Sequence, residues 1–207
     1  MFAGLRADRP VGTARSDNEG KYRSSNPVVR RLVARFLECV GDLVEAQRPR
    51  RILEVGCGEG IVIEYLSGRV PGARFDGVEL DPGALARGRR RCATAALFQA
   101  DAYELPFARK SHDLVLCLEV LEHLQEPGRA LKEIRRVARA DCLLSVPHEP
   151  FFRLGNLVRG KNLLGLGNPT DHVQHWDARG FAAFCAGELA VRTTTRSFPW
   201  LIVHGTV

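Results

Sequence analysis

The fold is decided by the stretch ILEVGCGEG, residues 52–60. It opens with apolar residues, which predict a short buried strand. Gly56, Gly58 and Gly60 follow at alternate positions, and the next residues, 61–66 (IVIEYL), predict the start of a helix. Glycines let the backbone turn tightly and let a ligand approach the amides at a helix N-terminus. A strand, a glycine turn and a helix in this order therefore predict the first half of a βαβ nucleotide-binding unit.

An acid within the predicted strand makes this pattern more specific. Glu54 precedes Gly56 by two residues, and the glycine spacing is G-x-G-x-G rather than the dinucleotide G-x-G-x-x-G. The string EVGCGEG resembles motif I of the class I S-adenosylmethionine (SAM) dependent methyltransferases. The resemblance implies that SAM is the cofactor and that Glu54 lies near its amino-acid end. It also implies that Gly56, Gly58 and Gly60 pass beneath the cofactor.

Further candidate cofactor ligands follow the next two predicted strands. Residues 73–80 predict a strand that ends at Glu79, about 20 residues after the glycines, where nucleotide-binding folds place a carboxylate that accepts hydrogen bonds from the ribose hydroxyls. Residues 95–99 predict a third strand. After it, the resemblance implies that Asp101 binds the adenine amino group and that Ala102 offers its backbone amide. An ordinary Asx turn is the structural alternative at Asp101.

The rest of the chain alternates between helix and strand patterns. Apolar residues recur at helical spacing from Pro27, and Asn26 is placed to cap that helix. Strand patterns follow at residues 113–118 and 142–146, and a predicted antiparallel hairpin at residues 189–198 and 200–206 ends the chain. With the resemblance, this order predicts an α/β fold, namely a Rossmann-like, seven-stranded, mostly parallel sheet with helices on both faces and a C-terminal antiparallel hairpin.

A group of candidate metal ligands follows the strand at residues 113–118. Glu119, Glu122 and His123 are spaced i, i+3 and i+4, so on a helical turn their side chains would share one face. Two carboxylates and an imidazole together suit a divalent cation such as Mg²⁺ or Mn²⁺. The string E-x-x-E-H is similar to ubiquinone-pathway O-methyltransferases and to small-RNA 3′-end 2′-O-methyltransferases, where it is associated with a metal. In the alternative interpretation Glu119 contacts the cofactor, Glu122 is solvated, and His123 packs or caps.

The long segment at residues 147–176 leaves the edge of the sheet where substrate is expected, and its length predicts a lid. His148 lies at its start. The small-RNA methyltransferases carry a D-H-x-F-E-W element here whose histidine completes their metal site. Asp171, His172 and Trp176 match that element, and the two residues before Trp176 depart from it. The resemblance thus adds His172 to the candidate metal ligands.

Length and composition indicate one globular domain. Of 207 residues, 45% are hydrophobic, which is enough for a full core. Residues 1–20 lack periodicity and predict a mobile N-terminal arm, and residues 21–207 predict a single methyltransferase domain with the lid inserted. No stretch is apolar enough for a membrane span, the N-terminus lacks a signal-peptide core, and the six cysteines form no C-x-x-C pair, so we expect a cytoplasmic protein. Three arginines at residues 89–91 predict a solvated helix face.

These observations predict an enzyme that transfers the methyl group of SAM to an oxygen of a small-molecule acceptor. His123, His148 and His172 are candidate bases for the acceptor hydroxyl. Two alternatives stay open. One is RNA 2′-O-methylation, which the departures after His172 and the lack of an RNA-binding extension disfavour. The other is a protein that binds SAM without catalysis. The sequence does not indicate an oligomeric state.

Overall fold

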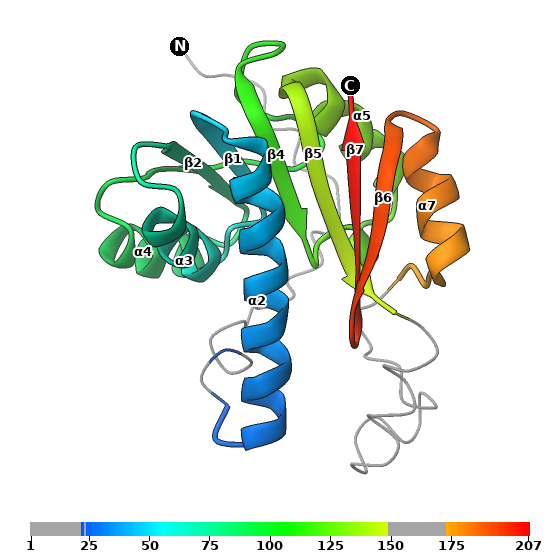
Figure 1. Ribbon diagram of the computed structural model, residues 1–207. Helices are drawn as coiled ribbons and strands as arrows, with labels where there is room; N and C mark the ends of the chain where they lie inside the picture. The colour runs from blue at the N-terminus through cyan, green and yellow to red at the C-terminus, as the bar shows by residue number, and fades with distance from the viewer. Residues whose placement is uncertain (1–21, 23, 149–172) are drawn as a thin grey trace.

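The protein forms one seven-stranded sheet in the computed structural model, which describes residues 22, 24–148 and 173–207 (Figure 1). The strand order is β3-β2-β1-β4-β5-β7-β6, in which the first five strands are parallel and β7 is antiparallel to both neighbours. The predicted fold class, including the C-terminal hairpin, is confirmed. The strands are β1 (Arg51–Val55), β2 (Arg74–Glu79), β3 (Ala96–Gln99), β4 (His112–Leu118), β5 (Ala138–Pro147), β6 (Ala190–Ser197) and β7 (Trp200–Thr206).

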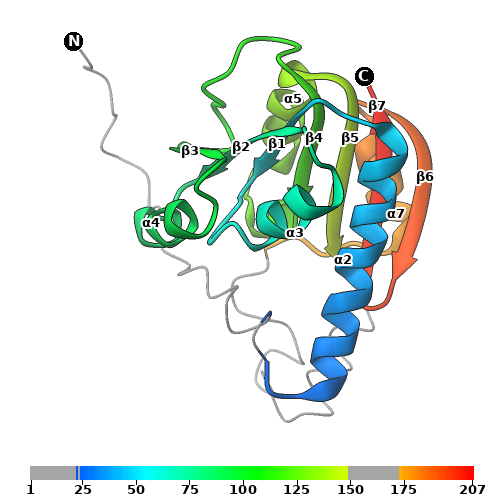
Figure 2. The same cartoon turned by 60° about the vertical axis from the view of Figure 1, so that its left-hand side comes forward.

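Helices cover both faces of the sheet (Figure 1, Figure 2). Along β4, Leu114 and Leu116 belong to the core under one set of helices, whereas Val115 and Cys117 belong to the core under the other. Both faces of this strand are buried, which explains its continuous apolar run. The first set is α2 (Pro27–Gln47), α3 (Ile61–Arg69) and α4 (Pro82–Arg91), the second is α5 (Pro127–Val137) and α7 (Ala178–Ala186), and the 3₁₀ turn η1 (Leu121–His123) follows β4.

Of the helices α2, α3 and α4, two begin at side-chain caps and one does not. Asn26 Oδ1 accepts a hydrogen bond from Val28 N–H at the start of α2, and Asp81 Oδ1 accepts one from Gly83 N–H at the start of α4, both at 2.9 Å. Such caps satisfy amides that the first helical turn leaves without intrahelical partners. In contrast, α3 begins after Gly60 with no side-chain cap. Its first amides are therefore available to a ligand.

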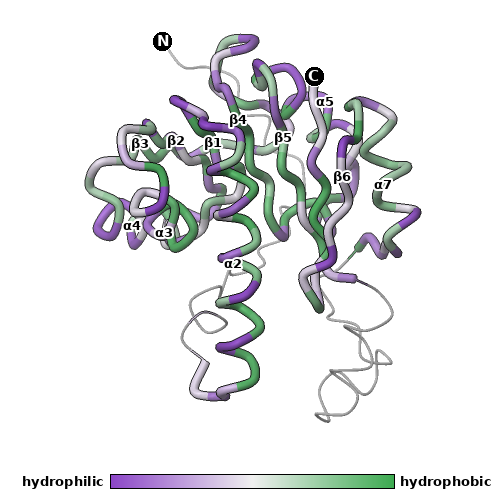
Figure 3. The backbone as a smooth tube through the Cα atoms, in the orientation of Figure 1, coloured by the Kyte–Doolittle hydropathy of each residue, from purple (hydrophilic) through white to green (hydrophobic). Residues whose placement is uncertain are grey.

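Hydropathy follows the layered architecture. The central strands β4 and β5 are mostly hydrophobic (Figure 3).

The N-terminal half of α2 projects past the carboxyl ends of the strands, so it flanks the edge where α/β sheets bind ligands (Figure 1). All six cysteines are free and five of them are buried.

Some sequence predictions concern residues that the structure does not describe. The mobile arm expected at residues 1–20 and most of the lid expected at residues 147–176 lie outside the described residues. Among the helices of residues 22, 24–148 and 173–207, none has both the length and the apolar character needed to cross a bilayer.

Candidate cofactor site

The glycine loop after β1 brings backbone amides close to the carboxyl edge of the sheet. Gly56 N–H and Cys57 N–H both donate to Val78 O, at 2.8 and 2.9 Å, which anchors the loop to β2. All three glycines of the loop have positive φ angles, between 51° and 74°. A Cβ atom at Gly56 would lie 2.4 Å from Val120 Cγ2, so a side chain at this position would clash. The loop geometry therefore requires glycine for conformation and for space.

Glu79, at the end of β2, is held against this loop. Its Oε2 accepts a hydrogen bond from Gly58 N–H and its Oε1 accepts one from Asp81 N–H, both at 2.9 Å. The side chain is half-buried, and each carboxylate oxygen can accept a further hydrogen bond. Two fixed acceptor oxygens at a strand end suit the role predicted for Glu79, which is to bind both hydroxyls of a ribose.

A pocket lies between the glycine loop, the start of α3 and the end of β4. Its lining includes three carboxylates, Glu54, Glu59 and Glu119, and the phenol ring of Tyr22. The pKa of Tyr22 is raised by burial and then by the charges of Glu54, Glu119 and Glu59. The pocket is therefore strongly acidic. Its other lining residues are Gly56, Cys57, Ile61, Val62 and Leu118.

Two of these carboxylates bury an oxygen that lacks a hydrogen-bond partner among the described residues. These atoms are Oε2 of Glu54 and Oε2 of Glu59, whose residues are 3% and 1% exposed. Burial, followed by the charge of Glu79, raises the pKa of Glu54 well above its usual value. Because an unpaired buried acceptor costs free energy, we infer that a ligand supplies donors at this place.

Glu119 is positioned by elements that are distant in the sequence. It leaves β4 with a φ of 59°, in the left-handed region. Trp200 Nε1–H donates to its Oε2, and Ser145 Oγ–H donates to its Oε1 at 3.3 Å. The Trp200 ring in turn packs on Phe36 of α2, with 4.9 Å between the ring centroids. Sequence reasoning missed Trp200 and Ser145, because their roles depend on β5 and β7 lying next to the end of β4.

The structure does not assemble the predicted metal triad of Glu119, Glu122 and His123. Within the described part of the chain, no three His, Cys, Asp or Glu side chains are placed to hold a metal ion. The chain turns at Glu119 before it enters η1, so these residues do not share the face of a helical turn. Glu122 is buried rather than solvated, and its charge, after burial, raises the pKa of Cys117. His172, the fourth predicted ligand, lies outside the described residues.

The other predicted site residues lie outside the lining of this pocket. Asp101 Oδ1 accepts a hydrogen bond from Tyr103 N–H at 2.9 Å, which forms the Asx turn considered as the alternative. Asp101 and Ala102 follow β3 at the carboxyl edge, and their contact with adenine stays a prediction. His123 in η1 and His148 after β5 are both half-buried near that edge, and their role as bases also stays a prediction.

The chemical groups of the site fit SAM. The fixed carboxylate of Glu79 suits a ribose. The buried acceptor oxygens of the pocket suit the cationic groups of SAM, which are an ammonium and a sulfonium. The uncapped start of α3 suits the carboxylate of its amino-acid end.

Comparisons with known proteins agree with this chemistry. Residues 53–146 match a family described as a methyltransferase domain. A trans-aconitate 2-methyltransferase from Methylobacterium nodulans is 32% identical over 166 residues, which cover 76% of this chain and 57% of that protein. A probable S-adenosylmethionine-dependent methyltransferase from Mycobacterium tuberculosis is 35% identical over 97 residues, which cover 47% of this chain and 35% of that protein. The chain thus spans less than two thirds of the length of these relatives.

A solved structure extends the likeness to the whole fold. Magnesium protoporphyrin IX methyltransferase from Synechocystis PCC 6803, determined with bound SAH, has a TM-score of 0.69 and covers 92% of this chain and 94% of its own. Its sequence identity is 16%, so this match concerns the fold alone. The family match includes the glycine loop, Glu79 and Glu119. Residues 53–146 therefore form a methyltransferase domain that is similar to SAM-dependent methyltransferases, and the chain has the fold of these enzymes.

Proposed function

We propose that the protein transfers the methyl group of SAM to an oxygen atom of a small-molecule acceptor. The observation that carries this proposal is the acidic pocket beside the glycine loop. There Glu79 is fixed by two backbone amides, and Glu54 and Glu59 each bury an oxygen without a partner among the described residues. The relative named trans-aconitate 2-methyltransferase supports an acceptor of low molecular weight.

The protein contributes mainly alignment. Bound SAM supplies an electrophilic methyl group on its sulfonium. Glu79 holds the ribose, and Glu119 bounds the pocket at the end of β4, so the donor is held in one orientation toward the carboxyl edge. A base at that edge takes the proton of the acceptor hydroxyl as the new bond forms. The candidates are His123 and His148, with His172 outside the described residues.

Cofactor binding is tested by thermal unfolding. A ligand selective for the folded state raises the melting temperature, so millimolar SAM should raise that of the wild-type protein. Glu79→Ala should remove most of this rise because it deletes the ribose acceptor. Glu126→Ala, which removes an exposed acid paired with Arg129, is the matched control and should keep the rise. A folded wild-type protein that shows no rise contradicts the proposal.

The acceptor class is tested with methyl-labelled SAM. The protein is incubated separately with a small-metabolite extract and with short RNA, and we expect label in the small-molecule fraction. Label in RNA, together with an oligonucleotide affinity that falls steeply with salt, would instead establish RNA methylation. SAM binding with no label in either fraction would indicate a binding protein without catalysis.

A further inference from the structure

Glu59 is a buried acid to which the proposed reaction gives no role. It stands between Gly58 and Gly60 of the loop, two residues before α3 begins, and is 1% exposed. Its Oε1 accepts a hydrogen bond from Arg87 Nη2–H at 2.9 Å. Its Oε2 is buried and has no hydrogen-bond partner among the described residues, and the residue lines the acidic pocket. Arg87 fixes one oxygen, so the other is held at a defined position.

Helix α4 holds Glu59 through its backbone as well as its side chain. Arg91, one turn after Arg87, donates from Nη1–H to Glu59 O at 2.9 Å. The helix approaches the loop closely, since a Cβ at Gly88 would lie only 3.2 Å from Gly58 O. The arginines expected to form a solvated face are thus partly engaged, and that prediction was wrong for Arg91. Two arginines position Glu59, yet one of its oxygens is left for another donor.

The start of α3 adds the opposite electrostatic preference beside this carboxylate. The helix begins after Gly60 without a side-chain cap, and Ile61 and Val62 line the same pocket as Glu59. Amides of a first helical turn attract an anion, whereas the carboxylate of Glu59 attracts a cation. An α-amino acid carries a carboxylate and an ammonium on one carbon atom. The two neighbouring features of the pocket are complementary to that zwitterion.

We propose that Glu59 recognises the α-ammonium group of the cofactor's amino-acid end, while the first-turn amides of α3 bind the adjacent carboxylate. The inference rests on the proposed function and names a specificity-determining residue for it. In the complex the ammonium donates to Glu59 Oε2, the acceptor that has no hydrogen-bond partner among the described residues of the free protein. Affinity for the nucleoside part then depends on Glu79, and affinity for the amino-acid part depends on Glu59.

The test compares two ligands that differ only in the amino-acid part. Calorimetry on the whole protein measures binding of S-adenosylhomocysteine, which has that part, and of 5′-methylthioadenosine, which lacks it. Glu59→Gln should weaken S-adenosylhomocysteine binding roughly ten- to a hundredfold, as expected for a charge-assisted hydrogen bond, and leave 5′-methylthioadenosine binding unchanged. Glu126→Gln removes the same charge from the start of α5, where Glu126 pairs with Arg129 outside the pocket lining, and should change neither.

Equal weakening of both ligands, or weakening of neither, would overturn the inference. The same holds if Glu54→Gln, and not Glu59→Gln, gives the ligand-specific loss. If Glu59→Gln does not fold, Arg87→Gln decides, because it keeps the carboxylate but releases it. Arg87→Gln should weaken binding of S-adenosylhomocysteine selectively, by a smaller factor than Glu59→Gln does. Equal weakening of both ligands would contradict the inference. A wild-type protein that binds neither ligand would show that the proposed function itself fails.

Discussion

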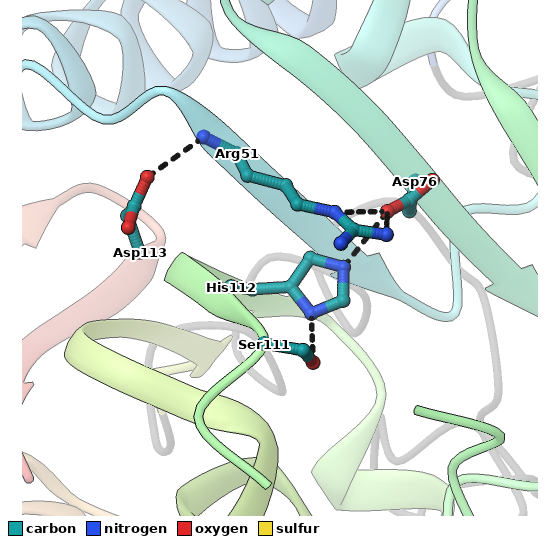
Figure 4. Close-up of polar contacts among 5 residues, drawn as sticks. All are labelled: Arg51, Asp76, Ser111, His112 and Asp113. Atoms are coloured by element: carbon teal, nitrogen blue, oxygen red, sulfur yellow. Dashed lines mark hydrogen bonds and ion pairs between the residues drawn. The ribbon is translucent and has the colours of Figure 1, made fainter. Parts of the chain in front are cut away.

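Buried acids lie at both ends of the parallel strands, at the amino edge where the strands begin and at the carboxyl edge where they end. The two edges differ in the hydrogen-bond partners of these acids. At the amino edge, Asp76 Oδ2 lies 2.8 Å from Arg51 Nη2 and 2.9 Å from His112 Nε2 (Figure 4). At the carboxyl edge, Glu54 and Glu59 each keep a buried oxygen without a partner in the described part of the chain. At the amino edge, protein groups compensate the charge of Asp76, which indicates a structural role. The carboxyl edge leaves compensation to a ligand.

The amino-edge cluster contains serine, histidine and aspartate, but its arrangement is that of a core network. His112 is fully buried, and its ring packs edge-on against Phe107 with 4.7 Å between centroids. A carboxylate only accepts, so His112 Nε2–H donates to Asp76, and Nδ1 accepts from Ser111 Oγ–H at 2.9 Å. These contacts join the beginnings of β1, β2 and β4 (Figure 4).

The largest effect is expected from removing the acid at the amino edge. Asp76→Ala leaves the buried N–H of His112 without an acceptor, so we expect a loss of about 2 kcal/mol in the free energy of unfolding, measured in urea. The ion pair with Arg51 adds little, because that side chain is 47% exposed. The rise in melting temperature with SAM should persist.

The matched control for Asp76→Ala lies at the same edge. Arg139→Gln breaks a pair with Asp113 in which the arginine is 59% exposed, and such changes usually stay within about 0.5 kcal/mol. If Asp76→Ala costs no more than Arg139→Gln, the amino-edge cluster is not structural and the contrast between the edges fails.

The next effect concerns the dependence of stability on pH at the amino edge. The pKa of His112 is lowered chiefly by burial, although the bond to Asp76 raises it. Histidine in the unfolded chain titrates near pH 6.5, so the unfolded state binds a proton first. Stability is then complete above about pH 6.5 and falls as the pH drops, by at most about 1.4 kcal/mol per pH unit. His112→Asn should flatten this slope in urea unfolding at about pH 7 and pH 5. An unchanged slope would assign it to another group.

The smallest effect is expected at the carboxyl edge and has the opposite sign. The pKa of Glu54 is raised, so the folded protein binds a proton more readily than the unfolded chain, in which Glu titrates near pH 4.3. Its contribution to stability is lost as the pH rises. Glu54→Gln should therefore stabilise the free protein at neutral pH by on the order of 1 kcal/mol, while it reduces the shift in melting temperature with SAM. A variant that is less stable yet binds SAM fully would contradict this.

Features that depend on neighbours within a few residues could be predicted from the sequence. The Asn26 cap, the glycine turn and the continuous apolar run of β4 all follow from local sequence. The site predictions were less complete. Glu79 could be placed because a strand end and a chain spacing determine its position. Glu59 was overlooked, because its burial depends on α4 packing against the loop.

The acids after β4 show where local pattern stops being sufficient. The spacing of Glu119, Glu122 and His123 places their side chains on one face only if the backbone is helical over these residues. Tertiary structure decided otherwise, because the chain turns at Glu119 and Trp200, 81 residues away, donates to its carboxylate. His112 and Asp76, 36 residues apart, meet for the same kind of reason. The sequence alone determined the elements and the glycine loop, since these depend on short-range interactions. Which buried acids are paired and which await a ligand depends on strands and helices that meet only in the folded protein.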